Sequence, residues 1–405
     1  MAAMRLGLLG IDAGMADVAA AAVRRGDRIT VAHGVDPARL RDLDAPAAAA
    51  WDRLLDASLC DVVLVGADGW NAERATAVRT LVQAGRPLLL AQPLELSMLW
   101  AFELDMIRRD TGALLVPCLP DRLHPFVRRL REALTASLAG VGGVGDVESL
   151  QLERRMTDRS RPAVLAQLAR DADLVRTLAG DPAKLSTLGA ADPDAAWGTL
   201  AVGFSGPAQV PVRWQVAPAA EPGLTLRLQS ARGSIVIDAP DDPGRPWTWT
   251  APGAAPESVA FDRGAAMLAV IDLGIAAAAG HGSPSADAAT WADAARAIEL
   301  AETVPRSLAR GRAIDLHREE FTEMGTFRGT MASLGCGLIV AALVVVVLAT
   351  LVAGIAREFG WKFAGALVDS WPLIVLAVLG LFLALQILPL LVATGGDDGS
   401  PRRPT

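Results

Sequence analysis

The sequence predicts an α/β protein with a Rossmann-type, doubly wound parallel sheet, followed by a second α+β domain with an open, mainly antiparallel sheet. Over the first 120 or so residues, short and almost continuous apolar runs alternate with segments whose apolar residues recur at helical spacing. Continuous apolar strands indicate burial on both faces of a sheet, which is typical of parallel strands. From about residue 147 the strands follow one another between turns rich in Pro, Gly and Asp, which favours antiparallel pairing.

The first domain, placed at residues 1–122, is expected to contain five strands separated by helices. Its apolar runs have the length of strands, and the segments between them carry apolar residues on one helical face. The expected strands are residues 4–10, 29–35, 61–66, 87–92 and 113–119, and the expected helices are residues 15–25, 71–84 and 96–109.

The second domain, placed at residues 123–315, begins with a helix from 125 to about 138 and a Gly-rich link at 140–145. The stretch 240–256 is rich in Pro, Gly and Asp, and we expect it to be an exposed loop. The expected strands are residues 147–156, 198–204, 210–216, 224–229 and 234–237, and the expected helices are residues 162–178, 263–279 and 286–309.

Two C-terminal segments have the composition of transmembrane helices. Residues 334–356 and 371–394 contain no charged side chain, and each is long enough to cross a hydrocarbon core of ~30 Å at 1.5 Å per residue. A buried hairpin of a globular domain is the alternative, but both segments exceed the length expected of core helices. We therefore expect the lipid bilayer to be a partner through residues 334–394. The connecting segments are a juxtamembrane linker at 316–333, a short external loop at 357–370 and a polar tail at 395–405.

The N-terminus indicates on which side of the membrane the body lies. Its apolar run is too short for a signal peptide, and Asp12 interrupts it. Two crossings return the chain to its starting side. The expected location is the cytoplasmic membrane, with the body and the tail in the cytoplasm.

Composition argues against two classes of function. The net charge is −7 and Lys and Arg are not clustered, so nucleic acid is not an expected partner. The three cysteines form no C-x-x-C pair, and no His, Cys and Asp spacing matches a metal site. We expect reduced, buried thiols and no metal.

The segment after the first strand has the form of a strand, a tight turn and a helix, where a G-x-G-x-x-G dinucleotide fingerprint would lie. Gly10 fits its first position, but Asp12 and Met15 occupy the second and third, and Gly14 is out of register. The Asp12 carboxylate would face the pyrophosphate at the helix N-terminus, or it simply caps the helix. Asp36, at the end of the second strand, is placed to bind an adenosine ribose, or it is a capping or turn residue.

Ordered landmarks then extend over residues 4 to 355. They are DVVLVG at 61–66, AGRPLLLAQP at 84–93, GALLVPCLPDRLHP with Arg122 and Pro125, ARDADLVRTLAGDP at 169–182, and RAIELAETVPRSLARGRAIDL at 296–316. In this order they resemble the Gfo/Idh/MocA family of NAD(P)-dependent sugar and inositol oxidoreductases. The continuation into the apolar C-terminus resembles a membrane-anchored subgroup of planctomycete-type bacteria.

The resemblance implies catalytic positions, and this sequence departs from the family at most of them. In the family the Lys of a Glu-Lys-Pro triplet contacts the substrate and the nicotinamide ribose, and here the triplet is Ala91, Gln92 and Pro93, so Gln92 stands at a cofactor-binding position. The family's acid/base His is Arg170, although Asp173 three residues later is kept. Its upstream Asp is Ala166, and its Pro-Asn-x-x-His segment is Trp70 to Arg74. An arginine cannot accept a proton near neutral pH. None of the four histidines (His33, His124, His281 and His317) lies at a family catalytic position, and His281 is interpreted as a loop residue.

The resemblance therefore predicts an NAD(P)-binding oxidoreductase fold with a sugar, inositol or nucleotide-sugar ligand and with weak or lost catalysis. If NAD or NADP is used and turnover persists, Asp171 and Asp173 are the candidate replacement bases. Arg170, Asp171 and Asp173 form either an ion-pair cluster at the pocket or a solvated helix face. The alternative function is a non-catalytic nucleotide- or sugar-binding or scaffolding protein at the cytoplasmic membrane face. The open sheet of this architecture also implies a homo-oligomer.

Overall fold

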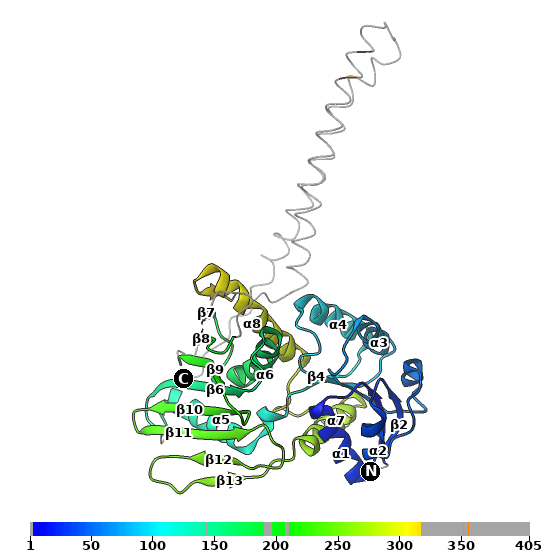
Figure 1. Cartoon of the computed structure of the whole chain (residues 1–405), viewed down its shortest axis with the longest axis horizontal. Helices are drawn as coiled ribbons and strands as arrows, with labels where there is room; N and C mark the ends of the chain where they lie inside the picture. Colours follow the sequence, from blue (N-terminus) through cyan, green and yellow to red (C-terminus); the bar gives the residue numbers. More distant parts are fainter. Residues whose placement is uncertain are drawn as a thin grey trace, which may run out of the picture. The chain divides into compact units, whose positions relative to one another are not determined.

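The computed structural model describes residues 3–141, 144–189, 197–206 and 210–316, together with Leu351 and Ile355. The chain divides into two units, Met1–His317 and Arg318–Thr405, and the first of these is described below (Figure 1). The predicted spans at 334–356 and 371–394, the loop, the tail and all of the linker except Leu316 lie outside the described residues, apart from Leu351 and Ile355. No helix in the described ranges is long and apolar enough to span a membrane.

The first sheet has five parallel strands, as predicted. Their order is β2-β1-β3-β4-β5, with every neighbouring pair parallel. The order reverses between β1 and β3, and in such sheets ligands bind outside the carboxyl ends of the strands at this switch point. The strands are β1 (Arg5–Leu9), β2 (Arg28–His33), β3 (Val62–Val65), β4 (Leu88–Ala91) and β5 (Leu115–Cys118).

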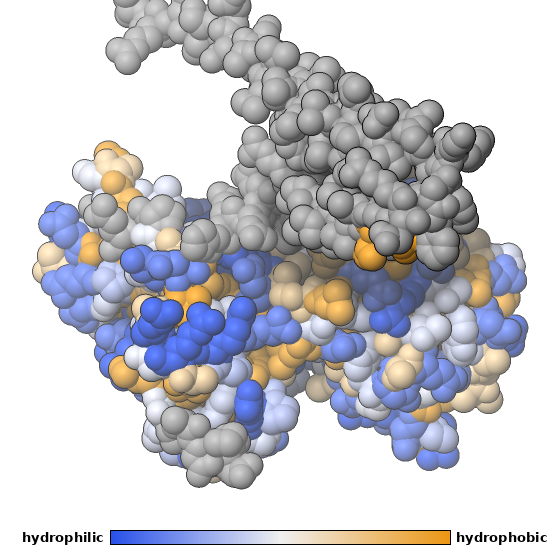
Figure 2. Space-filling view, turned by 90° about the horizontal axis from the view of Figure 1, so that it is seen from above, coloured by the Kyte–Doolittle hydropathy of each residue, from blue (hydrophilic) through white to orange (hydrophobic). Residues whose placement is uncertain are grey.

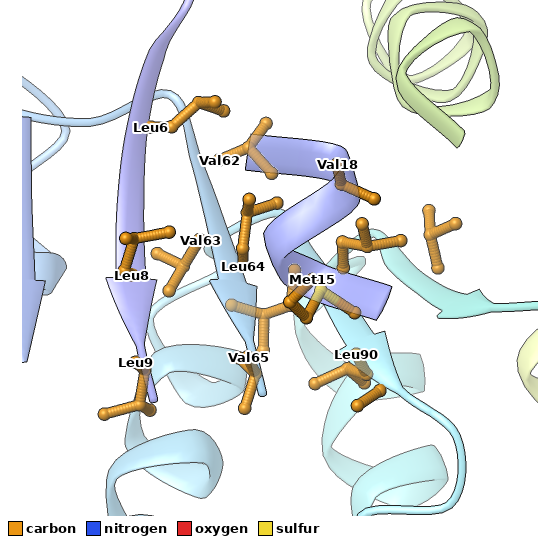
Figure 3. Packing of buried hydrophobic residues seen from close by; sticks show 14 of the residues in the cluster. Leu6, Leu8, Leu9, Met15, Val18, Val62, Val63, Leu64, Val65 and Leu90 are labelled. Atoms are coloured by element: carbon orange, nitrogen blue, oxygen red, sulfur yellow. The ribbon is translucent and has the colours of Figure 1, made fainter. Parts of the chain in front are cut away.

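Helices on both faces explain why the central strands are almost wholly apolar. All four residues of β3 are buried, and Met15 and Val18 of the first helix pack against β1, β3 and β4 (Figure 3). Late in the chain, α7 packs on α1, and Gly264 permits this because a Cβ there would collide with the Asp17 carbonyl. The helices are α1 (Ala13–Arg25), α2 (Pro37–Asp42), η1 (Trp51–Leu55), α3 (Ala72–Gln83), α4 (Met98–Thr111) and α7 (Arg263–Ala278).

The second sheet has nine strands in the order β13-β12-β11-β10-β6-β9-β8-β7-β14. Every neighbouring pair is antiparallel except β6 and β9, so the prediction of a mainly antiparallel sheet is confirmed. The strands are β6 (Val147–Met156), β7 (Lys184–Leu188), β8 (Ala201–Ser205), β9 (Val212–Pro218), β10 (Gly223–Ser230), β11 (Gly233–Pro240), β12 (Trp247–Thr250), β13 (Glu257–Val259) and β14 (Ile314–Asp315).

Three helices cover one face of this sheet. They are α5 (Pro125–Leu138), which follows the short helix η2 (Pro120–Leu123), α6 (Arg161–Ala179) and α8 (Trp291–Arg310). Leu150 and Leu152 of β6 join their core, whereas Gln151 between them is exposed on the opposite face. In Figure 2, hydrophilic residues cover much of the visible surface of the described residues, with hydrophobic ones scattered between them.

The expectation of an exposed loop at 240–256 is wrong for its centre. Residues Trp247–Thr250 form β12, and Trp247 and Trp249 are each only 3% exposed. Both rings pack near α5, with Trp247 stacked on His124 and Trp249 tilted against Phe126. The alternating Trp-Thr-Trp-Thr pattern is a strand signal that the surrounding Pro and Gly residues obscure. The last helix also begins later than expected, at Trp291, because Thr290 and Asp293 form a capping box.

Candidate functional site

The carboxyl ends of β1, β2 and β3 meet at a glycine-lined edge. Gly10 has a φ of +68° and its N–H donates to the His33 carbonyl of β2 at 2.8 Å. At the end of β3, a Cβ on Gly66 would collide with the backbone of Ile11, so the two turns approach as closely as glycine allows. In Rossmann folds this is the edge that receives a dinucleotide.

Asp12 occupies the anion-binding end of α1 with its own carboxylate. Oδ1 accepts from the N–H of Met15 at 3.0 Å, and Oδ2 accepts from the N–H of Ala67 at 2.8 Å. Asp12 is therefore the N-cap of α1 and also joins the turn after β1 to the turn after β3. Gly14 lies in the first turn of the helix, where its Cβ position faces Asp12 Oδ1 at 3.3 Å. The capping alternative for Asp12 describes this geometry.

Arg74 fills the glycine-lined edge from the other side. Its helix, α3, begins after the N-cap Asn71, whose side chain accepts from the Arg74 N–H. The Arg74 guanidinium donates to the carbonyls of Gly34, at 2.8 Å, and Asp68. A Cβ at Gly10 or at Gly34 would overlap it, and the arginine is only 9% exposed. In the sequence, Arg74 stands where the family's Pro-Asn-x-x-His segment has its His, but the sequence does not show where the arginine side chain lies.

Asp36 is a capping residue in this structure. Its Oδ1 accepts from the N–H of Ala38 at 2.7 Å and caps α2, and Pro37 occupies the first helical position. Asp36 itself is exposed. The capping alternative given for this residue matches the geometry, and no nucleotide is needed to explain it.

A dinucleotide does not fit this edge in its usual position. Its pyrophosphate would need the N–H groups at the start of α1, and Asp12 already takes two backbone donors there and in the facing turn. The space beside Gly10 and Gly34 holds the Arg74 guanidinium. We therefore derive no chemical step through NAD or NADP.

Gln92, at the carboxyl end of β4, is turned into the protein interior. It is 4% exposed, and its side-chain amide donates to the carbonyl of Ala294 in α8 at 3.0 Å. This contact joins the end of β4 to a helix 202 residues later in the sequence. The expected role as a cofactor-binding or substrate-orienting residue is not supported by this arrangement.

Asp173 is held in a buried network at the junction of α6, α8 and η2. Arg122 Nη1 lies 2.9 Å from Asp173 Oδ1 and 3.7 Å from Asp293 Oδ2, and the side chains of Arg122 and Asp173 are 11% and 2% exposed. Arg176 continues the network to Asp293 at 2.9 Å and to Asp181. Burial raises the pKa of Asp173 to about 6, although Arg122 opposes that rise.

Asp171 lies in a second buried network, on the sheet side of α6. It pairs with Arg154 of β6 and accepts from Trp214 Nε1 at 2.8 Å and from Gln167 at 3.1 Å. Arg170 is exposed. The expectation of a cluster formed by Arg170, Asp171 and Asp173 is wrong, because the two carboxylates pair with other arginines. A solvated helix face is correct only for Arg170.

The remaining histidines and cysteines form no reactive site among the described residues. His124 is fully buried, accepts from the Phe126 N–H and stacks on Trp247, and burial lowers its pKa to about 4. His281 lies in an exposed turn, as expected. Burial raises the pKa of the Cys118 thiol at the end of β5. Within the described ranges no group of three or more His, Cys, Asp or Glu side chains is arranged to hold a metal ion.

No protein-family profile and no curated protein sequence matches this chain. Solved structures do. A putative myo-inositol dehydrogenase from Sinorhizobium meliloti is 18% identical with a TM-score of 0.58, over 78% of this chain and 100% of that one. The UDP-N-acetylglucosamine 3-dehydrogenase from Acidithiobacillus ferrooxidans is 18% identical with a TM-score of 0.58, over 76% and 98% of the two chains.

An aldose-aldose oxidoreductase from Caulobacter crescentus has a TM-score of 0.62 at 15% identity, over 78% of this chain and 100% of its own. Each match covers nearly the whole of the solved chain and about three quarters of this one. At these identities the likeness establishes the fold. The chain therefore has the two-sheet fold of inositol and sugar dehydrogenases.

Proposed function

We propose that this chain is a membrane-held protein of the inositol- and sugar-dehydrogenase fold that binds a sugar, inositol or nucleotide-sugar ligand without transferring hydride. The observation that argues against hydride transfer is the position of Gln92, Arg170 and Asp173, which stand at the family's catalytic positions. Gln92 is bound to α8, Arg170 cannot take up a proton, and Asp173 is buried against Arg122. A general base must lie within hydrogen-bond reach of the hydroxyl that it deprotonates.

An active oxidoreductase with a substitute base is the second candidate, and one observation favours it. Asp173 has a pKa of about 6, which suits a base near neutral pH. Its side chain is only 2% exposed and its Oδ1 is already bonded to Arg122, so a substrate would have to reach a buried carboxylate with one oxygen occupied. Asp171 is even less available to a substrate, because both of its carboxylate oxygens are bonded to Arg154, Trp214 and Gln167. We therefore place this candidate second.

The membrane part of the proposal rests on the sequence. Residues 334–356 and 371–394 carry no charge and have spanning length. In this proposal the hairpin anchors the body at the cytoplasmic face, where it binds its ligand or scaffolds partner proteins. In this proposal two copies pair through the face of the second sheet opposite α5, α6 and α8. Gln151, Arg213 and Arg227 are exposed and adjacent in register on that face.

The test uses the full-length chain in detergent micelles. Each nicotinamide cofactor is combined with a panel of polyols, aldoses and nucleotide sugars, and the absorbance of the reduced cofactor is followed. We expect turnover below about 0.1 s⁻¹, far under the usual enzyme median of about 10 s⁻¹. The same panel is scored for thermal stabilisation without cofactor, where a ligand should raise the melting temperature. Faster turnover that disappears in Asp173→Asn would establish the second candidate instead.

A further inference from the structure

Arg74 has an unusual position for an arginine near the N-terminus of a surface helix. Its guanidinium is turned inward, over the edge at which β1 and β2 end. Three glycines surround it: a Cβ at Gly10 or Gly34 would overlap the guanidinium, and one at Gly69 would lie 3.2 Å from Nη2. Each of these glycines has a positive φ, between +63° and +69°. The guanidinium thus occupies a space that glycine backbone leaves free.

The position is fixed by contacts within the fold. Nη2 donates to the Gly34 carbonyl directly after β2, and Nη1 donates to the Asp68 carbonyl in the loop before α3. Asn71 caps the helix that carries Arg74 and so sets its starting point. With 9% exposure, the side chain has left most of its water. Loss of water also lowers the pKa of Arg74, as expected for a cation without a carboxylate bonded to it.

In this fold class the space that Arg74 occupies is normally taken by part of the dinucleotide. In Rossmann folds the end of the first strand faces the pyrophosphate, and the end of the second strand faces the adenosine ribose. Gly10 and Gly34 mark these two strand ends. A ligand with an adenosine diphosphate moiety and the Arg74 guanidinium would therefore compete for the same volume.

We propose that Arg74 is a built-in occupant of the adenosine side of this groove, and that shortening it opens a binding site for adenine dinucleotides. The alternative is that Arg74 swings outward and clamps a phosphate, as arginines near the second strand do for NADP. The two proposals predict opposite effects of the same substitution. An occupant weakens binding by being present, whereas a clamp strengthens it. The inference is independent of hydride transfer, because it concerns binding alone.

The experiment titrates the full-length chain in detergent micelles with NADH and with NADPH, following the fluorescence of the reduced nicotinamide. Arg74→Ala is measured in the unmodified chain and in a chain with Asp12→Gly, which frees the N–H groups of Met15 and Ala67. We expect Arg74→Ala to lower the Kd at least tenfold in the Asp12→Gly background. The matched control is Arg79→Ala on the same helix, because Arg79 pairs with Glu103 of α4 and not with the carbonyls at the strand ends. It should leave the Kd unchanged.

Circular dichroism and melting temperature check that each variant is folded. If Arg74→Ala unfolds, Arg74→Gln is used, because glutamine retains an amide donor and is too short to fill the whole guanidinium volume. The proposal is overturned if folded Arg74 variants bind NADH and NADPH no more tightly than the chains with Arg74 intact, both with Asp12 present and with Asp12→Gly. It is overturned equally if they bind NADPH more weakly, since that result identifies a phosphate clamp.

Discussion

The guanidinium of Arg122 lies 2.9 Å from the carboxylate of Asp173 and joins the short helix η2, at the end of the first sheet, to the middle of α6. Both residues stand at positions where the sequence resembles the Gfo/Idh/MocA family. Here the pair continues through Asp293 and Arg176 to Asp181. A carboxylate held in this way helps to organise the junction between the two sheets and is poorly placed to meet a substrate.

Asp173 should destabilise the protein as the pH rises. Its pKa is about 6 in the fold, against a usual value of 3.8, so the folded state binds the extra proton. The stability that this gives is fully present below about pH 4 and is lost as the pH rises through about 6. At about 1.4 kcal/mol for each pKa unit, the loss approaches about 3 kcal/mol. The difference in melting temperature between wild type and Asp173→Asn, measured from pH 4.5 to 7, should shrink or change sign accordingly. A constant difference would contradict the prediction.

His124 should act in the opposite direction over the same range. Burial lowers its pKa from 6.5 to about 4, so the unfolded state binds the proton first. Stability is present above about pH 6.5 and is lost as the pH falls through about 4. Because the two effects oppose each other, His124→Asn should remove the loss due to His124, and its melting temperature should fall less on acidification than that of wild type. Asparagine keeps the capping acceptor for α5. A His124→Asn profile identical to that of wild type would refute this account.

Asp171 should be essential for stability. Arg154 is 2% exposed and pairs with Asp171, so Asp171→Asn leaves a buried cation with only the half-exposed Asp241. Breaking a buried pair in this way typically costs about 3–5 kcal/mol. Asp241→Asn is the control and should cost about 1 kcal/mol, because that carboxylate is 41% exposed and screened by solvent. Chemical denaturation of both variants provides the comparison, and equal losses would show that the buried Asp171 contributes no more to stability than the exposed Asp241.

The membrane hairpin is testable by truncation. Both apolar segments of spanning length, residues 334–356 and 371–394, lie after residue 325, so a chain ending there should remain in the supernatant after centrifugation of a cell lysate. The full chain should remain in the membrane pellet after a high-salt wash and be released by detergent. A truncated chain that still sediments with washed membranes would show another anchor.

The five strands of the first sheet were predictable because their apolar runs report burial directly, whereas β7, β12, β13 and β14 of the second sheet were not predicted. The predicted strands at 61–66 and 87–92 contain β3 and β4. The helices α3 and α4 begin directly after their N-cap residues, Asn71 and Ser97. Local signals of this kind need no knowledge of the rest of the fold. For Asp12 and Asp36 the sequence correctly offered capping as an alternative.

The side chains that decide the site were not predictable in the same way. Gln92 bonds to Ala294, 202 residues away, and Arg74 ends over glycines of three different loops. Asp171 and Asp173 are two positions apart on one helix and reach different arginines, Arg154 and Arg122. A long side chain ends where the tertiary structure offers a partner, and a single sequence does not state which partner that is.

The most direct measurement is the affinity of the unmodified, full-length chain for NADH and NADPH, determined by calorimetry in detergent micelles. Because the Asp12 carboxylate takes the N–H donors and the Arg74 guanidinium fills the groove, we predict a Kd weaker than about 1 mM for both cofactors, or about −4 kcal/mol of binding free energy. A Kd near 1 μM for either cofactor, about −8 kcal/mol, would contradict the account, because it would show that neither Asp12 nor Arg74 blocks the cofactor site.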